Sequence, residues 1–245
     1  MLNRYSLQSG MTLIELMIAG VIALIALSSV ITVYSATANH SSQQLQQAHL
    51  HQQLHGLMHL ISSDLKRAGY WSFSPNLLAP SGNPFQSPTN QVRIHSYDGE
   101  NPDSCILFSY DLDQDGLVGI GRCDDSGCSN QTDDDNVEQF GFRLHDARIQ
   151  SRFGGTEFDC ESGNWQTVND PDIEITQLRF EQRSRCLNLF EIDRDCTPES
   201  SQLIQGGIEI QLHGQISSKP DRGITLSHWV RVRNDLLREG DSDAN

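Results

Sequence analysis

The sequence predicts an α+β protein in which a long N-terminal α-helix packs on a domain of antiparallel β-sheet. A stretch without proline runs from Met11 to Ala68, and its second half repeats apolar side chains at three- and four-residue spacing, as an amphipathic helix does. Runs of alternating apolar and polar residues then recur between residues 91 and 233, which is typical of half-buried antiparallel strands. One helix and one globular domain account for the 245 residues.

The first half of the predicted helix, from Met11 to Val33, is apolar and contains one ionisable side chain, Glu15. As a helix, this segment rises roughly 35 Å, which is enough to cross a hydrocarbon core of about 30 Å. A carboxylate inside such a segment costs several kcal/mol unless a partner compensates its charge. The sequence therefore predicts a segment buried in a membrane or among other helices, and a cationic partner for Glu15.

The second half of the helix has an apolar stripe, which we expect to pack on the domain. Its members are Leu45, Leu50, Leu54, Leu57, Met58, Ile61 and Leu65. Gly69 is suited to end the helix because glycine adopts a left-handed backbone without strain, so we expect a helix from about Thr12 to Ala68. Residues 70–90 contain four prolines and are expected to form the loop between helix and sheet.

The C-terminal part is predicted to be rich in β-strands. We expect strands at Gln91–Tyr97, Cys105–Tyr110, Glu138–His145, Ile173–Gln182, Gly207–Ile216 and Leu226–Arg233. Residues 91–237 would form this domain, and residues 238–245 a solvated tail.

The chain is acidic, with a formal net charge of −15 from 32 acidic and 17 basic residues. Binding to a nucleic-acid backbone needs clustered basic residues, so no nucleic-acid partner is predicted. Before the apolar segment the only fixed charge is Arg4, which favours a cytoplasmic N-terminus and an exported domain.

All six cysteines lie in the C-terminal part, and an even number in an exported domain indicates disulfides. Six cysteines permit fifteen connectivities. We favour Cys123 with Cys128 and Cys186 with Cys196 as local loops, which leaves Cys105 with Cys160. The spacings match no common zinc finger, so a zinc site is the less favoured alternative.

A possible calcium-binding segment contains Asp111, Asp113 and Asp115, followed by Gly116. Acids at alternate positions on a tight turn can converge on one Ca²⁺ ion. The position where an EF-hand places glutamate is Arg122, so other acids would have to complete the site: Asp124, Asp125 or the run Asp133, Asp134 and Asp135. The alternative is a solvated acidic turn with no ion.

Three histidines, His51, His55 and His59, share one face of the predicted helix. Imidazoles at this spacing can chelate a metal, but no acid or cysteine lies nearby in sequence, so a polar strip facing solvent or a neighbouring subunit is favoured. No nucleophile elbow, metalloprotease motif or phosphate-binding glycine loop is present, and we expect no enzymatic activity.

The segment Gly10-Met11-Thr12-Leu13-Ile14-Glu15, with the apolar run after it, resembles the class III signal of type IV pilins and type II secretion pseudopilins. The resemblance implies that residues 1–10 are a leader and that a prepilin peptidase cuts between Gly10 and Met11 and N-methylates Met11. Residues 11–33 would lie in the membrane and later in the fibre core, and residues 34–69 would form the amphipathic half of the helix. Glu15 would then meet the N-terminal amine of a neighbouring subunit. Thr32 stands where the family usually has proline, so no proline kink is expected.

The end of the helix resembles that of PilW-like minor pilins and, more loosely, of the J-type minor pseudopilin, through Asp64, Arg67, Ala68, Gly69 and Tyr70. It implies a minor pilin of a type IV pilus, held in the inner membrane with a periplasmic domain and then moved to the pilus or cell surface. There it would support assembly in the pilus or its tip or priming complex. The implied partners are other major and minor pilins, the prepilin peptidase and the inner-membrane assembly platform. The alternatives are a J-type pseudopilin of a type II secretion system and a membrane-anchored exported binding or adhesin module.

Overall fold

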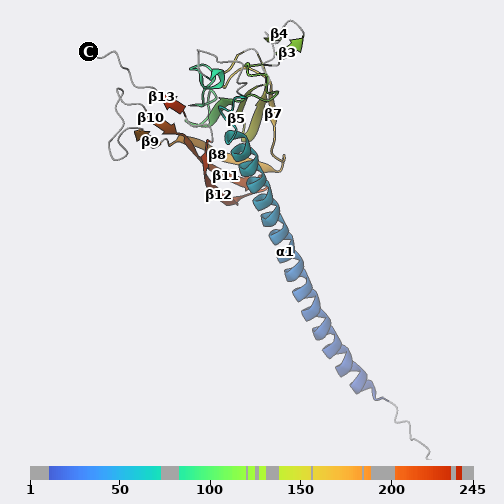
Figure 1. Cartoon of the computed structure of the whole chain (residues 1–245). Helices are drawn as coiled ribbons and strands as arrows, with labels where there is room; N and C mark the ends of the chain where they lie inside the picture. Colours follow the sequence, from blue (N-terminus) through green and yellow to red (C-terminus); the bar gives the residue numbers. More distant parts are fainter. Residues whose placement is uncertain are drawn as a thin grey trace, which may run out of the picture. The chain divides into compact units, whose positions relative to one another are not determined.

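The single α-helix of the described chain, α1, runs from Leu13 to Leu65 without interruption in the computed structural model (Figure 1). It passes through Thr32 unbroken, in agreement with the absence of proline there. The predicted end at Ala68 is three residues too late, because residues 66–69 form turns instead. Gly69 adopts φ +72° and donates its N–H to the Ser109 carbonyl at 2.7 Å, so the chain leaves the helix at this point.

The structure describes residues 11–72, 83–119, 121–124, 127–130, 138–155, 157–183, 185–188, 202–232 and 236–238. It describes only the backbone of the five short strands β3, β4, β9, β10 and β13. The chain divides into two compact parts, residues 1–49 and residues 50–245.

The first sheet of the domain is a five-stranded antiparallel meander in the order β1-β2-β5-β6-β7. Its strands are β1 (Arg93–His95), β2 (Cys105–Ser109), β5 (Gln139–His145), β6 (Arg148–Phe153) and β7 (Trp165–Thr167). A short 3-10 helix, η1 (Pro84–Gln86), precedes it inside the predicted loop. A separate hairpin joins β3 (Gly121–Asp124) to β4 (Gly127–Asn130).

The second sheet is three-stranded and antiparallel, in the order β12-β11-β8. Its strands are β8 (Ile173–Gln182), β11 (Gly207–Ile216) and β12 (Lys219–Arg231). A third sheet, of β9 (Arg185–Asn188), β10 (Gln202–Gln205) and β13 (Leu236–Arg238), has the order β13-β10-β9. In the chain β9 follows β8, β10 precedes β11 with Gly206 between them, and β13 follows β12. The third sheet therefore repeats the strand order of the second sheet beyond a break in the pairing (Figure 1).

The core lies where the end of α1 packs against the first and second sheets. The apolar stripe of the helix is buried from Leu50 onward: Leu50, Leu54, Leu57, Met58, Ile61 and Leu65. Strand residues from both sheets join the same cluster, among them Phe108, Phe142, Phe180 and Ile210. The expectation that Leu45 belongs to this stripe is wrong, because its side chain is 69% exposed. Spacing alone could not show at which turn of the helix the packed contact begins.

The predicted strands Ile173–Gln182 and Gly207–Ile216 match β8 and β11 residue for residue. Apolar residues alternate along the whole of β11, and along β8 with one shift of phase between Ile175 and Leu178, where the pairing of the two strands has a register shift. The expected 226–233 strand is too short, since β12 begins at Lys219. Its first half contains Pro220 and Gly223, which disfavour a strand in sequence but are tolerated at the edge of a sheet. Among the strands not predicted, β6 has the polar sequence Arg-Ile-Gln-Ser-Arg-Phe. Arg238, assigned to the tail, is the last residue of β13.

Candidate assembly surface and acidic loop

The N-terminal part of α1 exposes apolar side chains all around the helix. Leu13 is 79% exposed, Leu24 68% and Val33 66%, and their apolar neighbours between residues 11 and 34 are similar. By length and composition α1 is able to cross a membrane. A helix that is apolar on every face cannot be stable in water, so this surface requires a bilayer or other helices around it.

The first turn of α1 is capped by Thr12. The Glu15 N–H donates to the Thr12 carbonyl at 3.1 Å and to the Thr12 hydroxyl at 3.3 Å. Thr12 and Glu15 have the spacing of a capping box, a sequence signal that the prediction did not use. The Glu15 carboxylate itself is exposed and makes no hydrogen bond or ion pair with the described residues. It is therefore available to a cation of another molecule. Met11 is 67% exposed, while Gly10 lies outside the described residues.

The hydroxyl groups of this half are satisfied within the helix. Ser28 donates to the Ile25 carbonyl at 2.8 Å, and Thr32 donates to the Ser28 carbonyl at 2.8 Å. Ser29 and Ser35 bond in the same way, one turn back. Such internal bonds allow hydroxyl side chains to enter apolar surroundings without unpaired polar groups.

The motif residues lie where α1 ends, Asp64 in its last turn and Arg67 and Ala68 in the turns that follow. Arg67 forms an ion pair with Asp64, and its guanidinium lies 4.6 Å from the centre of the Tyr110 ring. Ala68 is fully buried. Burial, followed by the charge of Asp64, raises the pKa of Tyr110 to about 12, so its hydroxyl stays neutral. These residues connect the helix end to β2, the strand that leads into residues 111–119, which we call the acidic loop.

Residues after the helix hold the acidic loop directly. Asp111 donates its N–H to the Tyr70 carbonyl at 3.0 Å, and Ser72 donates its N–H to Asp111 Oδ2 at 2.9 Å. The Trp71 indole donates to the Gly116 carbonyl at 3.1 Å. The residues that end and follow the helix, from the minor-pilin motif onward, therefore position the acidic loop, where calcium binding is predicted.

In the acidic loop, carboxylate oxygens of Asp111, Asp113 and Asp115 lie within 4.8 Å of one another. Each carboxylate also accepts backbone N–H groups of the loop: Asp111 from Gln114 at 2.7 Å, Asp113 from Asp115 at 3.2 Å, and Asp115 from Leu117 at 2.7 Å. Burial is the main cause that raises the pKa of Asp115. The three predicted ligands are thus brought together, but calcium binding stays a prediction. The side chains of Asp124, Asp125 and residues 133–135 lie outside the described residues.

Glu138 organises the same loop, although no sequence motif marked it as a functional residue. Its buried carboxylate accepts the N–H groups of Leu112 at 2.6 Å and Gly119 at 2.9 Å. Burial raises its pKa to about 7, although these hydrogen bonds act in the opposite direction. No local pattern connects residue 138 with residue 112, so only the pairing of the strands reveals this role.

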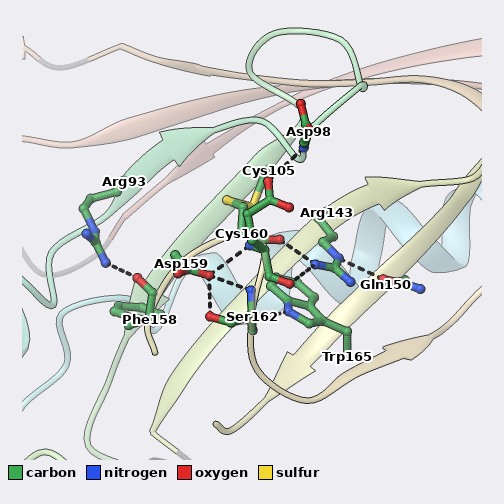
Figure 2. Close-up of a disulfide and its surroundings, with 11 residues drawn as sticks. Arg93, Asp98, Cys105, Arg143, Gln150, Phe158, Asp159, Cys160, Ser162 and Trp165 are labelled. Carbon is green, nitrogen blue, oxygen red and sulfur yellow. Dashed lines mark hydrogen bonds between the residues drawn. A yellow bond between two sulfur atoms is a disulfide. The ribbon is translucent and has the colours of Figure 1, made fainter. Parts of the chain in front are cut away.

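The opposite face of the first sheet is covered by a loop that a disulfide fixes. Cys105 of β2 is bonded to Cys160, with their Cα atoms 6.3 Å apart (Figure 2). Arg143 of β5 donates to the Cys160 carbonyl and lies 4.3 Å from the centre of the Trp165 ring. The loop therefore covers Arg143, and burial lowers the pKa of this residue.

A second buried arginine supports the same loop. Arg152 donates to the carbonyls of Gly155 at 3.1 Å and Glu157 at 2.7 Å. Its guanidinium and that of Arg93 lie 5.1 and 5.0 Å from the centre of the Phe158 ring. Burial lowers the pKa of Arg152 to about 10. Carbonyls and aromatic rings thus surround these cations, an arrangement that strand patterns in the sequence do not indicate.

The other predicted disulfides are only partly described. Cys123 and Cys128 are opposite each other in the register of β3 and β4, and Cys186 lies in β9, but their side chains are not described. Cys196 lies outside the described residues. The two local pairings stay predictions.

Comparison with known proteins agrees with the pilin resemblance. The family model for prepilin peptidase-dependent protein B matches residues 43–232. An uncharacterized protein of Haemophilus influenzae (strain ATCC 51907 / DSM 11121 / KW20 / Rd) is 25% identical over 210 residues, covering 76% of this chain and 79% of the relative. No solved structure matches. The matched region contains the packed end of α1, its terminal motif and both main sheets, and the chain belongs to the prepilin peptidase-dependent protein B family, whose members are related to type IV pilins.

Proposed function

We propose that this protein is a PilW-like minor pilin of a type IV pilus, which supports pilus assembly as part of the pilus or of its tip or priming complex. The observation that supports this best is the exposed apolar surface of α1 from Met11 to Val33, with Glu15 as its one carboxylate. The family adds dependence on a prepilin peptidase and a relation to the pilus system.

In this proposal the peptidase removes residues 1–10 and methylates Met11. Before assembly the protein is anchored in the inner membrane by α1, and its disulfide-containing domain lies in the periplasm. During assembly, residues 11–33 exchange lipid for the helices of major and minor pilins at the assembly platform. Glu15 pairs with the terminal amine of a neighbouring subunit, which offsets the cost of moving a carboxylate into apolar surroundings. The protein has a structural and not an enzymatic role.

The proposal is tested by measuring the N-terminal mass of the protein purified from membranes, with and without the organism's prepilin peptidase. The expected result is a chain that begins at N-methylated Met11, and an uncut chain when the peptidase is absent. A Gly10→Leu variant should stay uncut in both strains, because a bulky side chain blocks the cleavage position. An intact leader in the wild-type strain would overturn the proposal and favour an anchored exported receptor.

The choice between a pilus and a secretion pseudopilus is made by deleting the gene. Loss of surface pili with normal protein secretion is the expected result. Loss of secretion with normal pili would instead identify a J-type minor pseudopilin, which has the same processing and the same helix.

A further inference from the structure

We propose that His51 and His55 form a bidentate site for a transition-metal ion that prefers imidazole ligands, such as Zn²⁺ or Cu²⁺. The two residues are four positions apart on α1, so their side chains leave the same face of the helix one turn apart. Their ring centres are 6.1 Å apart and the ring planes are inclined by 14°, so the rings lie side by side. This site is separate from the acidic loop and does not depend on the proposed pilin function.

The backbone under the pair is held rigidly. Leu50 and Leu54, which directly precede the two histidines, are fully buried in the core between helix and sheets. Because the backbone is fixed, binding of an ion has to order the two side chains alone and not the helix that carries them. The histidine side chains themselves are exposed, so an ion reaches them from solvent without any opening of the domain.

Both imidazoles keep their ring nitrogens available. Within the described part of the chain, no hydrogen bond or ion pair holds His51 or His55; their one recorded contact is with each other. Tetrahedral coordination with metal–nitrogen bonds of about 2.0 to 2.1 Å requires two nitrogens roughly 3.3 Å apart. Side chains four residues apart leave the helix one turn from each other, so rotation of these exposed side chains about their own bonds brings one nitrogen of each ring to this separation.

The structure favours this pair over a three-histidine site. His59 lies two turns from His51, and the three side chains do not form a group with ligand atoms within 4.8 Å. Among these three histidines, the rings of His51 and His55 are the pair that stacks. Two positions on the ion therefore stay open for water. The site also differs from the acidic loop in its ligands, because imidazole nitrogens prefer transition metals whereas carboxylate oxygens suit Ca²⁺.

The test is calorimetric titration of Zn²⁺ into the full-length protein in detergent, without a histidine tag, in a buffer containing excess Ca²⁺. We expect one site whose affinity falls at least about tenfold in both His51→Gln and His55→Gln, since each removes a direct ligand. The matched control His59→Gln should bind as the wild type does. Equal affinity in the wild type and His51→Gln, or loss only in His59→Gln, would overturn the assignment.

A second measurement identifies the ligand atoms. Cu²⁺ bound at one equivalent should show hyperfine splitting from two nitrogens in its electron paramagnetic resonance spectrum, and this should disappear in His55→Gln. All variants should melt at the wild-type temperature, because exposed histidines support no core contact. A spectrum with oxygen ligands alone would contradict the proposal.

Discussion

The two halves of α1 have the same secondary structure but are built for different surroundings. From Met11 to Tyr34 apolar side chains are exposed on every side, whereas from Leu50 to Leu65 they form one stripe that is buried in the domain. Ile25 is 65% exposed, and Leu54 is fully buried. The domain of this chain therefore buries the apolar side chains of the second half of the helix and not those of the first half.

Contacts within this chain stabilise the packed half, whereas in the proposed role the exposed half is stabilised by lipid or by other subunits. Substitutions in the packed half should therefore change the stability of the domain, while substitutions in the exposed half should change membrane insertion or assembly.

Removal of the Glu15 carboxylate should have the largest effect, and only on assembly. In Glu15→Ala and Glu15→Gln cells, processing should continue while surface pili are lost, because the neighbouring amine has no partner. Ser29→Ala, on the same exposed half, is the matched control and should keep pili. Electron microscopy of sheared pili measures the outcome, and normal piliation in Glu15→Gln would remove Glu15 from the proposed mechanism.

Leu54→Ala should destabilise the domain by about 3 kcal/mol, since it opens a cavity in the core. Ile25→Ala, an apolar deletion in the exposed half, should leave the domain's free energy of unfolding unchanged within about 0.5 kcal/mol. Urea unfolding in detergent, followed by tryptophan fluorescence, measures both, because all three tryptophans lie after residue 70. Equal destabilisation by the two variants would show that the halves are not independent.

Calcium should stabilise the domain if the acidic loop binds it. Calorimetry in CaCl₂ should then show a melting temperature higher than in EDTA by about 2 to 4 °C per kcal/mol of stabilisation. Asp113→Asn is the appropriate variant to abolish this rise, because the Asp113 side chain is exposed and its hydrogen bond from the Asp115 N–H, at 3.2 Å, is longer than those that Asp111 and Asp115 accept at 2.7 Å. No rise in the wild-type protein would contradict calcium binding.

Glu138 should make the stability of the domain depend on pH. Its pKa is about 7 in the folded protein, above the ordinary value of 4.5, so the folded state binds more protons between these values. The stability that comes from this group is therefore present below pH 4.5 and decreases as the pH rises to about 7. As the pH rises from 4.5 to about 7, the free energy of unfolding of the wild type should fall relative to that of Glu138→Gln, as measured by urea unfolding without calcium. A constant difference would show that Glu138 does not titrate there.

The regular elements were the most predictable part of the fold. The limits of β8 and β11 and the buried positions from Leu50 to Leu65 follow from periodicity, because alternate residues of a strand and every third or fourth residue of a helix face the same side. Short polar strands such as β6 were missed, since their residues form a strand through pairing with neighbours and not through their own pattern.

The long helix, its two kinds of surface and the position of Glu15 follow from the amino-acid sequence alone, since these features depend on residues close together in the chain. Tertiary structure decided which distant groups meet: Gly69 with Ser109, Glu138 with the N–H of Leu112, and Cys105 with Cys160, one of several pairings open to it. It also decided that Arg143 and Arg152 are buried under a loop. The physical reason is that helix and strand periodicity arise from local backbone geometry, whereas these contacts arise from the order in which the strands pair.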